Sequence, residues 1–185
     1  MTPRGRHWLH DHRLPDHLAP GLAIVLCGIN PGRRSAATGH HYAGPGNRFW
    51  PALHRAGLTP RRLEPEEDAT LLRYGLGLTN LAPRSTAAAA ELGRAELEAG
   101  ARRLARALAD LRPHWLAVLG LGAYRAAFRE PHAAVGPQRR TIGDTRVWLL
   151  PNPSGRGTHY PLERLAAELD ALRRAAGLPR RSAHP

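Results

Sequence analysis

Three asparagines, Asn30, Asn80 and Asn152, each lie just past the end of an apolar, partly β-branched run of residues. Such a run is typical of a buried strand, and the Gly-Ile-Asn-Pro-Gly around Asn30 is typical of a tight turn at its end. In open α/β sheets, ligands bind outside the carboxyl ends of the strands. We therefore expect three amides to meet at one rim of a sheet, where a ligand would bind.

Further chemistry-bearing residues lie on the loop after the first of these runs. Glycines and prolines are frequent around Tyr42, and they hold a backbone so that its N–H groups can approach a ligand closely. Tyr42 offers a flat stacking surface, and His40 and His41 add hydrogen-bond donors. An isolated Asn-Pro-Gly, or the Asn152–Arg156 loop by itself, is most often an ordinary turn. Because one follows the first strand and the other the last, the pair favours a ligand site.

The charge of the chain favours a polyanionic partner. The sequence holds 27 Lys and Arg residues against 15 Asp and Glu, a formal charge of +12, and none of the 27 is lysine. A domain this basic is typical of nucleic-acid binding, although a coding bias toward arginine would give the same composition. Without lysine there is no side-chain amine for a Schiff base or for a P-loop contact to phosphate.

Cysteine and histidine give no sign of a metal centre. Cys27 is the only cysteine and lies within an apolar run, which excludes a Cys₄ zinc site, an iron–sulfur cluster and an intramolecular disulfide framework. His7, His10, His12 and His17 have no standard ligand spacing, so we interpret them as part of a His-rich arm. No metal or organic cofactor is expected. The absence of a long apolar run and of a signal peptide predicts a cytoplasmic protein.

Strands and helices alternate between two basic ends of the chain. We predict an arm over residues 1–19, a single domain over 20–178 and a basic tail over 179–185. The predicted strands cover residues 22–28, 75–79, 115–119 and 146–150, and the predicted helices cover 47–56, 65–73, 90–111, 123–128 and 161–177. Helices between successive strands imply a parallel sheet covered on both faces. The predicted fold is an α/β three-layer α/β/α sandwich with a central four-stranded, mainly parallel sheet.

The remaining ionisable and aromatic residues have ordinary interpretations. Asp68 follows Glu66 and Glu67 on a charged helix face, where we expect all three carboxylates to be solvated. Asp144 belongs to a Gly-Asp-Thr turn before the last strand, which suggests a hairpin-like approach to it. The tryptophans Trp8, Trp115 and Trp148 are interpreted as packing residues.

The motifs resemble those of the mismatch-specific uracil-DNA glycosylase and thymine-DNA glycosylase family, within the wider uracil-DNA glycosylase superfamily. The two signature motifs correspond to Gly28–Gly32 and Asn152–Gly155. Between them, Gly39–Tyr42 and Gly44–Trp50 are especially similar to the thymine-DNA glycosylase branch. The similarity runs from about residue 19 to residue 177, with both motifs in order and at family-like spacing.

The resemblance implies roles for the matched residues of the base pocket. Asn30 would position and polarise the water that attacks C1′ of the deoxyribose, and it is the expected catalytic residue. Tyr42 would stack on the flipped base, while the backbone at Ile29 and Tyr42 would bond its polar edge. Asn80 corresponds to a pocket position, and Asn152 fills the position of the second motif.

Further implied roles concern the duplex and the selectivity for the base. Arg156 matches the wedge that enters the duplex, with Ser154–Gly155 beside it on the same loop. Ser35, His41 and Asn80 would line the side of the pocket that faces C5 of the base, where one methyl group is worth only about 1–3 kcal/mol.

The resemblance and the charge together predict a DNA repair enzyme. It would hydrolyse the N-glycosidic bond of flipped uracil, with thymine and 5-modified pyrimidines as further candidates, in mispairs with guanine of double-stranded DNA. The absence of lysine makes it monofunctional, and we expect a monomer. Two alternatives stay open: a hydrolase of free nucleosides, which would not explain the +12 charge or Arg156, and a non-catalytic module that binds damaged or mismatched DNA.

Overall fold

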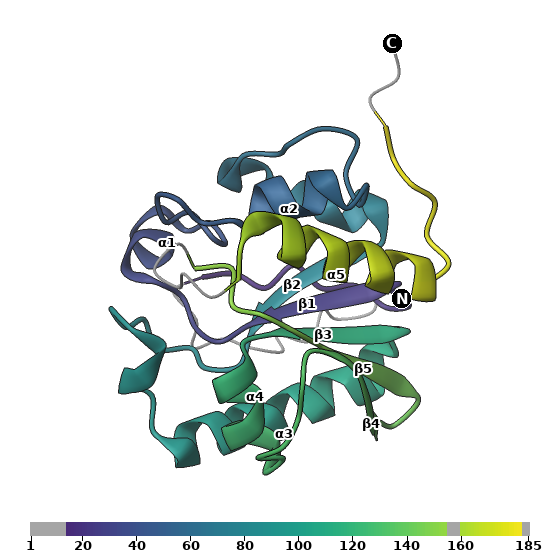
Figure 1. Ribbon diagram of the computed structural model, residues 1–185. Coiled ribbons are helices and arrows are strands. Elements are labelled where there is room, and N and C mark those ends of the chain that lie inside the picture. Colours follow the sequence, from purple (N-terminus) through teal and green to yellow (C-terminus); the bar gives the residue numbers. More distant parts are fainter. Residues whose placement is uncertain (1–13, 155–159, 183–185) are drawn as a thin grey trace, which may run out of the picture.

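The computed structural model describes residues 14–154 and 160–182, and within them five strands form one sheet (Figure 1). The strand order is β2-β1-β3-β5-β4. Four strands are parallel, and they are β1 (Ile24–Gly28), β2 (Leu76–Asn80), β3 (Trp115–Leu119) and β5 (Thr145–Leu150). The α/β fold with a mainly parallel central sheet is therefore confirmed. Because these strands share one direction, their carboxyl ends lie at one edge of the sheet.

The predicted number of strands was wrong, because the sheet has a fifth strand. This strand, β4 (Gly136–Ile142), runs antiparallel to β5 at the edge of the sheet and is joined to it by the turn at Gly143 and Asp144. Its residues are mostly polar and largely exposed, so no apolar run marks it. An edge position also tolerates Pro137, which has no N–H for a ladder hydrogen bond.

Helices cover both faces of the sheet (Figure 1). On one face, α2 (Phe49–Arg55), α5 (Leu162–Ala175) and the 3₁₀ helix η1 (Pro65–Tyr74) share one hydrophobic core with the strands. On the other face, α3 (Arg94–Leu111) and α4 (Leu121–Phe128) share a second core. Alternate strand residues point to opposite faces, so the central strands β1, β3 and β5 contribute side chains to both cores.

Several helix boundaries differ from the predicted ones. The apolar stripe expected on the long helix is buried, but α3 begins at Arg94 rather than at residue 90, after the short 3₁₀ helix η2 (Ala89–Glu91). The helix expected over 65–73 is the 3₁₀ helix η1. A short helix, α1 (Arg33–Thr38), was not predicted, because its six residues carry no apolar periodicity.

The described parts of both chain ends pack against the domain. Residues 14–19 were predicted to belong to the arm, yet Leu14 is buried and His17 exchanges two backbone hydrogen bonds of 2.9 Å with Leu78 of β2. Near the other end, the Arg181 N–H donates to the carbonyl of Gly57 at 2.8 Å. The first three predicted arm histidines and Trp8 lie outside the described residues.

Candidate functional site

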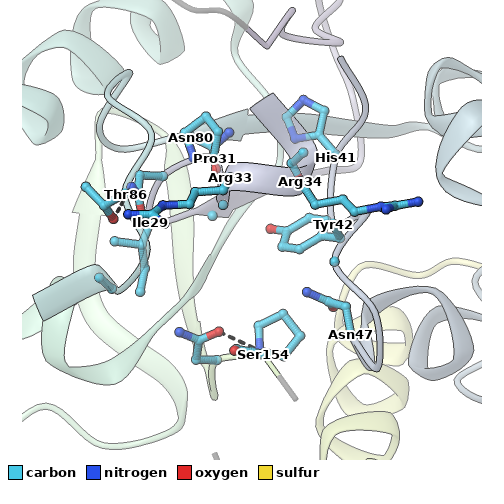
Figure 2. A pocket seen from close by; sticks show the side chains of 18 of the residues that line it. Ile29, Pro31, Arg33, Arg34, His41, Tyr42, Asn47, Asn80, Thr86 and Ser154 are labelled. Carbon is cyan, nitrogen blue, oxygen red and sulfur yellow. Dashed lines mark hydrogen bonds between the residues drawn. The ribbon is translucent and has the colours of Figure 1, made fainter. Parts of the chain in front are cut away.

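A cavity of about 840 Å³ opens at the carboxyl ends of β1 and β2 (Figure 2). Its walls come from residues 28–35, 41–42, 44–48, 86–89 and 152–154, with further contributions from single residues of neighbouring segments. The three asparagines that the sequence pointed to, Asn30, Asn80 and Asn152, all line this one cavity. Segments far apart in the sequence therefore meet where the topology of a parallel sheet places its ligand site.

The amide of Asn30 is held in one orientation. Its Nδ2 donates to the carbonyl of Arg84 and to Oγ1 of Thr86, both at 2.8 Å. The carbonyl can only accept, and the Thr86 hydroxyl hydrogen is already donated to the carbonyl of Ala88 at 2.8 Å. Both partners thus require an N–H donor, so the amide cannot be turned over. Its Oδ1 accepts no hydrogen bond from any residue that the structure describes and remains available to a ligand or water.

The side chains of Asn80 and Tyr42 meet at the backbone of Gly28. A Cβ atom at Gly28 would lie 2.4 Å from Oδ1 of Asn80 and 2.9 Å from the hydroxyl of Tyr42. Only glycine leaves room for both polar groups at the end of β1. The floor of the cavity is therefore built from the last residue pair of β1 and β2, Gly28 and Asn80, with the Tyr42 hydroxyl beside them.

Tyr42 has an unusual backbone conformation and a fixed ring. Its φ of 54° lies in the left-handed region, which a residue with a Cβ atom adopts only at a cost. The ring stacks on Phe49 with centroids 3.8 Å apart, so one face is covered while the residue lines the cavity. Burial raises the pKa of the Tyr42 phenol, which keeps it neutral. Its buried hydroxyl has no hydrogen-bond partner among the described residues.

Ser35 and His41, expected beside C5 of a base, also line the cavity. The hydroxyl oxygen of Ser35 accepts from the N–H of Ala43 at 3.0 Å, which ties α1 to the loop that carries Tyr42. His41 is only 1% exposed, and its ring Nε2 lies 2.9 Å from the carbonyl oxygen of Pro15. Both side chains are thus anchored within the protein as well as facing the site.

The loop after β5 forms the opposite wall. Asn152 Oδ1 accepts from the N–H of Ser154 at 2.9 Å, the pattern of an Asx turn. The carbonyl of Pro153 accepts from the N–H of Arg48 at 3.0 Å and joins this loop to the start of α2. Two residues predicted for the wedge, Gly155 and Arg156, lie outside the described residues.

Two arginines flank the mouth of the cavity. Arg33 and Arg34 are exposed, line the cavity, and extend to opposite sides of it in Figure 2. Neither forms an ion pair with any carboxylate in the described part of the chain. The described lining contains no Asp or Glu, and no three His, Cys, Asp or Glu residues of the described chain are placed to hold a metal ion. The described lining therefore offers amide and cationic side chains but no carboxylate base.

A comparison of the sequence with protein-family models matches residues 15–176 to the uracil DNA glycosylase superfamily. The match covers most of the chain and all residues that line the cavity except Leu14. The chain belongs to the uracil DNA glycosylase superfamily. Membership indicates a DNA glycosylase, a hydrolase that acts on uracil-like lesions in DNA. Among the residues that the structure describes, no helix is long and apolar enough to span a membrane.

Sequence reasoning missed two residues, one that lines this cavity and one that lies behind it. Thr86 orients Asn30 from 56 positions away, and no local pattern marks it. Asp68 was expected to be solvated, which is wrong: it is 3% exposed and faces the loop of His41 rather than water. Glu66 is exposed as expected, and Glu67 is ion-paired with Arg61 at the surface. A lone buried carboxylate among solvated neighbours cannot be recognised without the loop that covers it.

Proposed function

We propose that the protein is a mismatch-directed uracil-DNA glycosylase of the kind represented by the thymine-DNA glycosylase branch. It hydrolyses the N-glycosidic bond of flipped uracil opposite guanine and leaves an abasic site, with thymine and 5-modified pyrimidines as further candidate bases. One observation carries the proposal: the amide of Asn30 is fixed so that Oδ1 is presented at the cavity. The motifs that resemble this branch surround that amide.

The proposed reaction uses Asn30 to orient water rather than to deprotonate it. Oδ1 accepts a hydrogen bond from a water molecule and directs its oxygen to C1′ of the deoxyribose. As the C–O bond forms, the C1′–N1 bond breaks and its electron pair leaves on the uracil anion, while the water proton passes to solvent. An amide cannot hold that proton at neutral pH, so the barrier depends on stabilising the departing anion with preorganised donors. The backbone N–H groups of Ile29 and Tyr42 are the proposed donors.

The proposed base site lies between Tyr42 and the polar floor. The ring of Tyr42, supported from behind by Phe49, offers its other face to the base. Stacking on such a platform is worth about 1–3 kcal/mol. Asn80 bonds the polar edge of the base, while Ser35 and His41 lie on its C5 side. Uracil and its 5-substituted relatives then differ by contacts with these two side chains.

The duplex would be held by cations around the mouth. Flipping a base costs a few kcal/mol, and least at a mismatch, which favours mispaired uracil. Arg156, beside Ser154 and Gly155, is proposed to fill the space that the base leaves. Arg33 and Arg34 are proposed to contact the phosphates on either side of the flipped nucleotide. Because the sequence contains no lysine, the enzyme has no side-chain amine for a lyase step and is proposed to be monofunctional.

Four labelled DNA substrates test this function: G·U, A·U and G·T duplexes, and single-stranded DNA with one uracil. The expected result is alkali-labile product from G·U, with less from A·U. Replacing Asn30 with Ala should abolish base release and leave binding to the G·U duplex within about two-fold of wild type. Absence of an alkali-labile site in all four substrates would overturn the proposal, and unchanged binding would then favour a non-catalytic module.

A further inference from the structure

Asp68 is a buried carboxylate that the proposed chemistry does not use. It comes from η1, does not line the cavity, and has only 3% of its surface exposed. A carboxylate in such a position must be compensated by donors or cations. Burial by itself raises the pKa of Asp68. The His17 ring and the His41 backbone N–H outweigh that effect and lower this pKa to about 2. The group is therefore an anion one layer behind the base site.

Each oxygen of Asp68 contacts a different segment of the chain. Oδ1 lies 3.0 Å from Nε2 of His17, in the segment that precedes the sheet. Oδ2 accepts from the backbone N–H of His41 at 3.0 Å and lies 3.5 Å from Nδ1 of His40. One carboxylate thus joins η1 to the N-terminal segment and to the loop that carries Tyr42.

His41 is held at three points, and Asp68 is one of them. Its backbone N–H donates to Asp68, its ring bonds the carbonyl of Pro15, and its own carbonyl accepts from Nε1 of Trp50 at 3.2 Å. The next residue, Tyr42, has the left-handed φ of 54°. A strained backbone of this kind persists only where its surroundings over-determine it. The anchors on His41 fix the peptide that enters Tyr42.

The N-terminal segment is part of the same assembly. His17 is paired with Leu78 of β2 by two backbone bonds, and the buried side chain of Leu14 lines the cavity. Loss of the contacts of the Asp68 carboxylate would therefore loosen the backbone of His41. It would also loosen the N-terminal segment, which bonds the ring of His41. Both effects would act on the base site through Tyr42 and not through the water-orienting Asn30.

We propose that Asp68 is the positioning residue for the stacking platform: it locks His41 and the N-terminal segment together and thereby fixes the ring of Tyr42 against the flipped base. This inference rests on the proposed glycosylase function. It assigns residues 14–17 to the base site, together with a carboxylate that does not line the cavity. Loss of the Asp68 carboxylate should therefore weaken the binding of a duplex that has a base to stack on Tyr42. It should not weaken the binding of a duplex that lacks this base.

The test compares wild type with Asp68→Asn, which keeps the shape but removes the charge. Asp110→Asn, at an exposed carboxylate near the end of α3, is the matched control. Two G-paired duplexes are used, one with non-cleavable 2′-fluoro-deoxyuridine and one with a tetrahydrofuran abasic site. Asp68→Asn should weaken binding of the first by about ten-fold or more and of the second by less than about two-fold. Equal weakening of both duplexes, or of neither, would overturn the proposal.

A double-mutant cycle with Tyr42→Ala measures the coupling directly. In single-turnover excision of uracil from a G·U duplex, Asp68→Asn should slow wild type by about ten-fold but the Tyr42→Ala variant by less than about two-fold. Equal losses in both backgrounds would contradict a role through Tyr42. If Asp68→Asn does not fold, His17→Ala removes the contact between His17 and Asp68 instead. This variant should weaken binding of the duplex with 2′-fluoro-deoxyuridine by a smaller factor, and again leave binding of the abasic duplex nearly unchanged. A wild type without excision would count against the proposed function, whereas excision with an unimpaired Asp68→Asn would count against this inference alone.

Discussion

In the proposed reaction, the side chain of Asn30 is a weak functional group whose use depends on its neighbours. An amide is neither acid nor base at neutral pH, so its value lies in the direction of its oxygen. Two acceptors, the Arg84 carbonyl and the Thr86 hydroxyl, each take one amide hydrogen and thereby set that direction. Catalysis of this kind is sensitive to small errors in placement, because positioning supplies much of the rate.

Removing the Thr86 hydroxyl tests that orientation. Thr86→Val keeps the shape of the side chain, but the amide of Asn30 loses one of its two acceptors and is held only by the carbonyl of Arg84. A lost bond of this kind costs about 1–3 kcal/mol, so single-turnover uracil release should fall by about 10- to 100-fold. Binding to a G·U duplex should stay within about two-fold. The exposed Thr141 of β4 provides the control Thr141→Val, and an unaltered rate in Thr86→Val would show that the amide needs no such support.

The partly buried carboxylate of Asp16 leads to a prediction about how folding stability depends on pH. Burial raises the pKa of Asp16 to about 6, against opposing contributions from Thr79, Arg103 and His17. Below about pH 4 the group is protonated in the folded and unfolded chains alike, so it has no pH-dependent cost. Between about pH 4 and 6 only the unfolded chain ionises, and folding stability falls as the pH rises. The full cost, up to about 3 kcal/mol, is present above about pH 6.

The variant Asp16→Asn should lack this cost. Its free energy of unfolding in urea should exceed that of wild type by up to about 3 kcal/mol at pH 7.5. The difference should shrink through pH 6 and 5 and vanish near pH 3. The exposed Asp110→Asn variant should follow wild type throughout. A gap that is independent of pH would mean that ionisation of Asp16 is not its cause.

At the scale of elements, the packing of α3 determines where the segment after β2 runs. A Cβ atom at Gly100 of α3 would lie 2.1 Å from the carbonyl oxygen of Leu81. The N–H groups of Leu81 and Ala82 donate to the carbonyls of Gly28 and Ile29, so this segment continues alongside the end of β1. Its course places Arg84 and Thr86 next to Asn30. The contact of a helix with a loop thus supports the orientation of one amide.

Gly100→Ala should disturb this packing, because the new methyl group meets backbone that cannot rotate away. We expect a loss of about 1–3 kcal/mol in the free energy of unfolding, together with slower uracil release. Gly122→Ala in α4 is the matched control, since its Cβ would meet nothing within 4 Å. That variant should gain about 0.5–1 kcal/mol, the usual preference for alanine inside a helix. Equal unfolding midpoints for the two variants would contradict the close approach at Gly100.

The sequence predicted the elements whose own pattern is strong. The four parallel strands are apolar runs, and α3 carries a buried stripe at helical spacing, so both were found close to their observed bounds. Polar β4 and the six-residue α1 have no such pattern and were missed. The same holds at the site: Asn30, Asn80 and Tyr42 stand in recognisable motifs. Thr86 and Asp68 matter only through partners far along the chain, which a reading of local spacing cannot supply.

At the scale of the whole molecule, the described arginines fall into two groups, those with a carboxylate partner and those without one. Many described arginines have carboxylate partners, among them Arg84 with Glu96 and Arg129 with Glu98. Such pairs neutralise each other and attract no phosphate. The exposed Arg33 and Arg34, by contrast, have no carboxylate partner among the described residues and lie at the mouth of the cavity. We propose that the net charge attracts DNA to the protein, while the location of the unpaired arginines determines where the phosphates bind.

Salt dependence separates these two contributions. The double variant Arg33→Ala/Arg34→Ala should weaken binding to G·U and to fully paired duplexes alike, because phosphate contacts carry no base information. Each lost contact should reduce the slope of log K against log salt by about 0.9, so the double variant should lose about 1.8. The control is Arg106→Ala/Arg139→Ala, which removes two exposed arginines of α3 and β4 that also lack a carboxylate partner in the described chain. It carries the same change in net charge, so a slope that falls equally in both double variants would mean that overall charge, and not the arginines at the mouth, binds the backbone of the duplex.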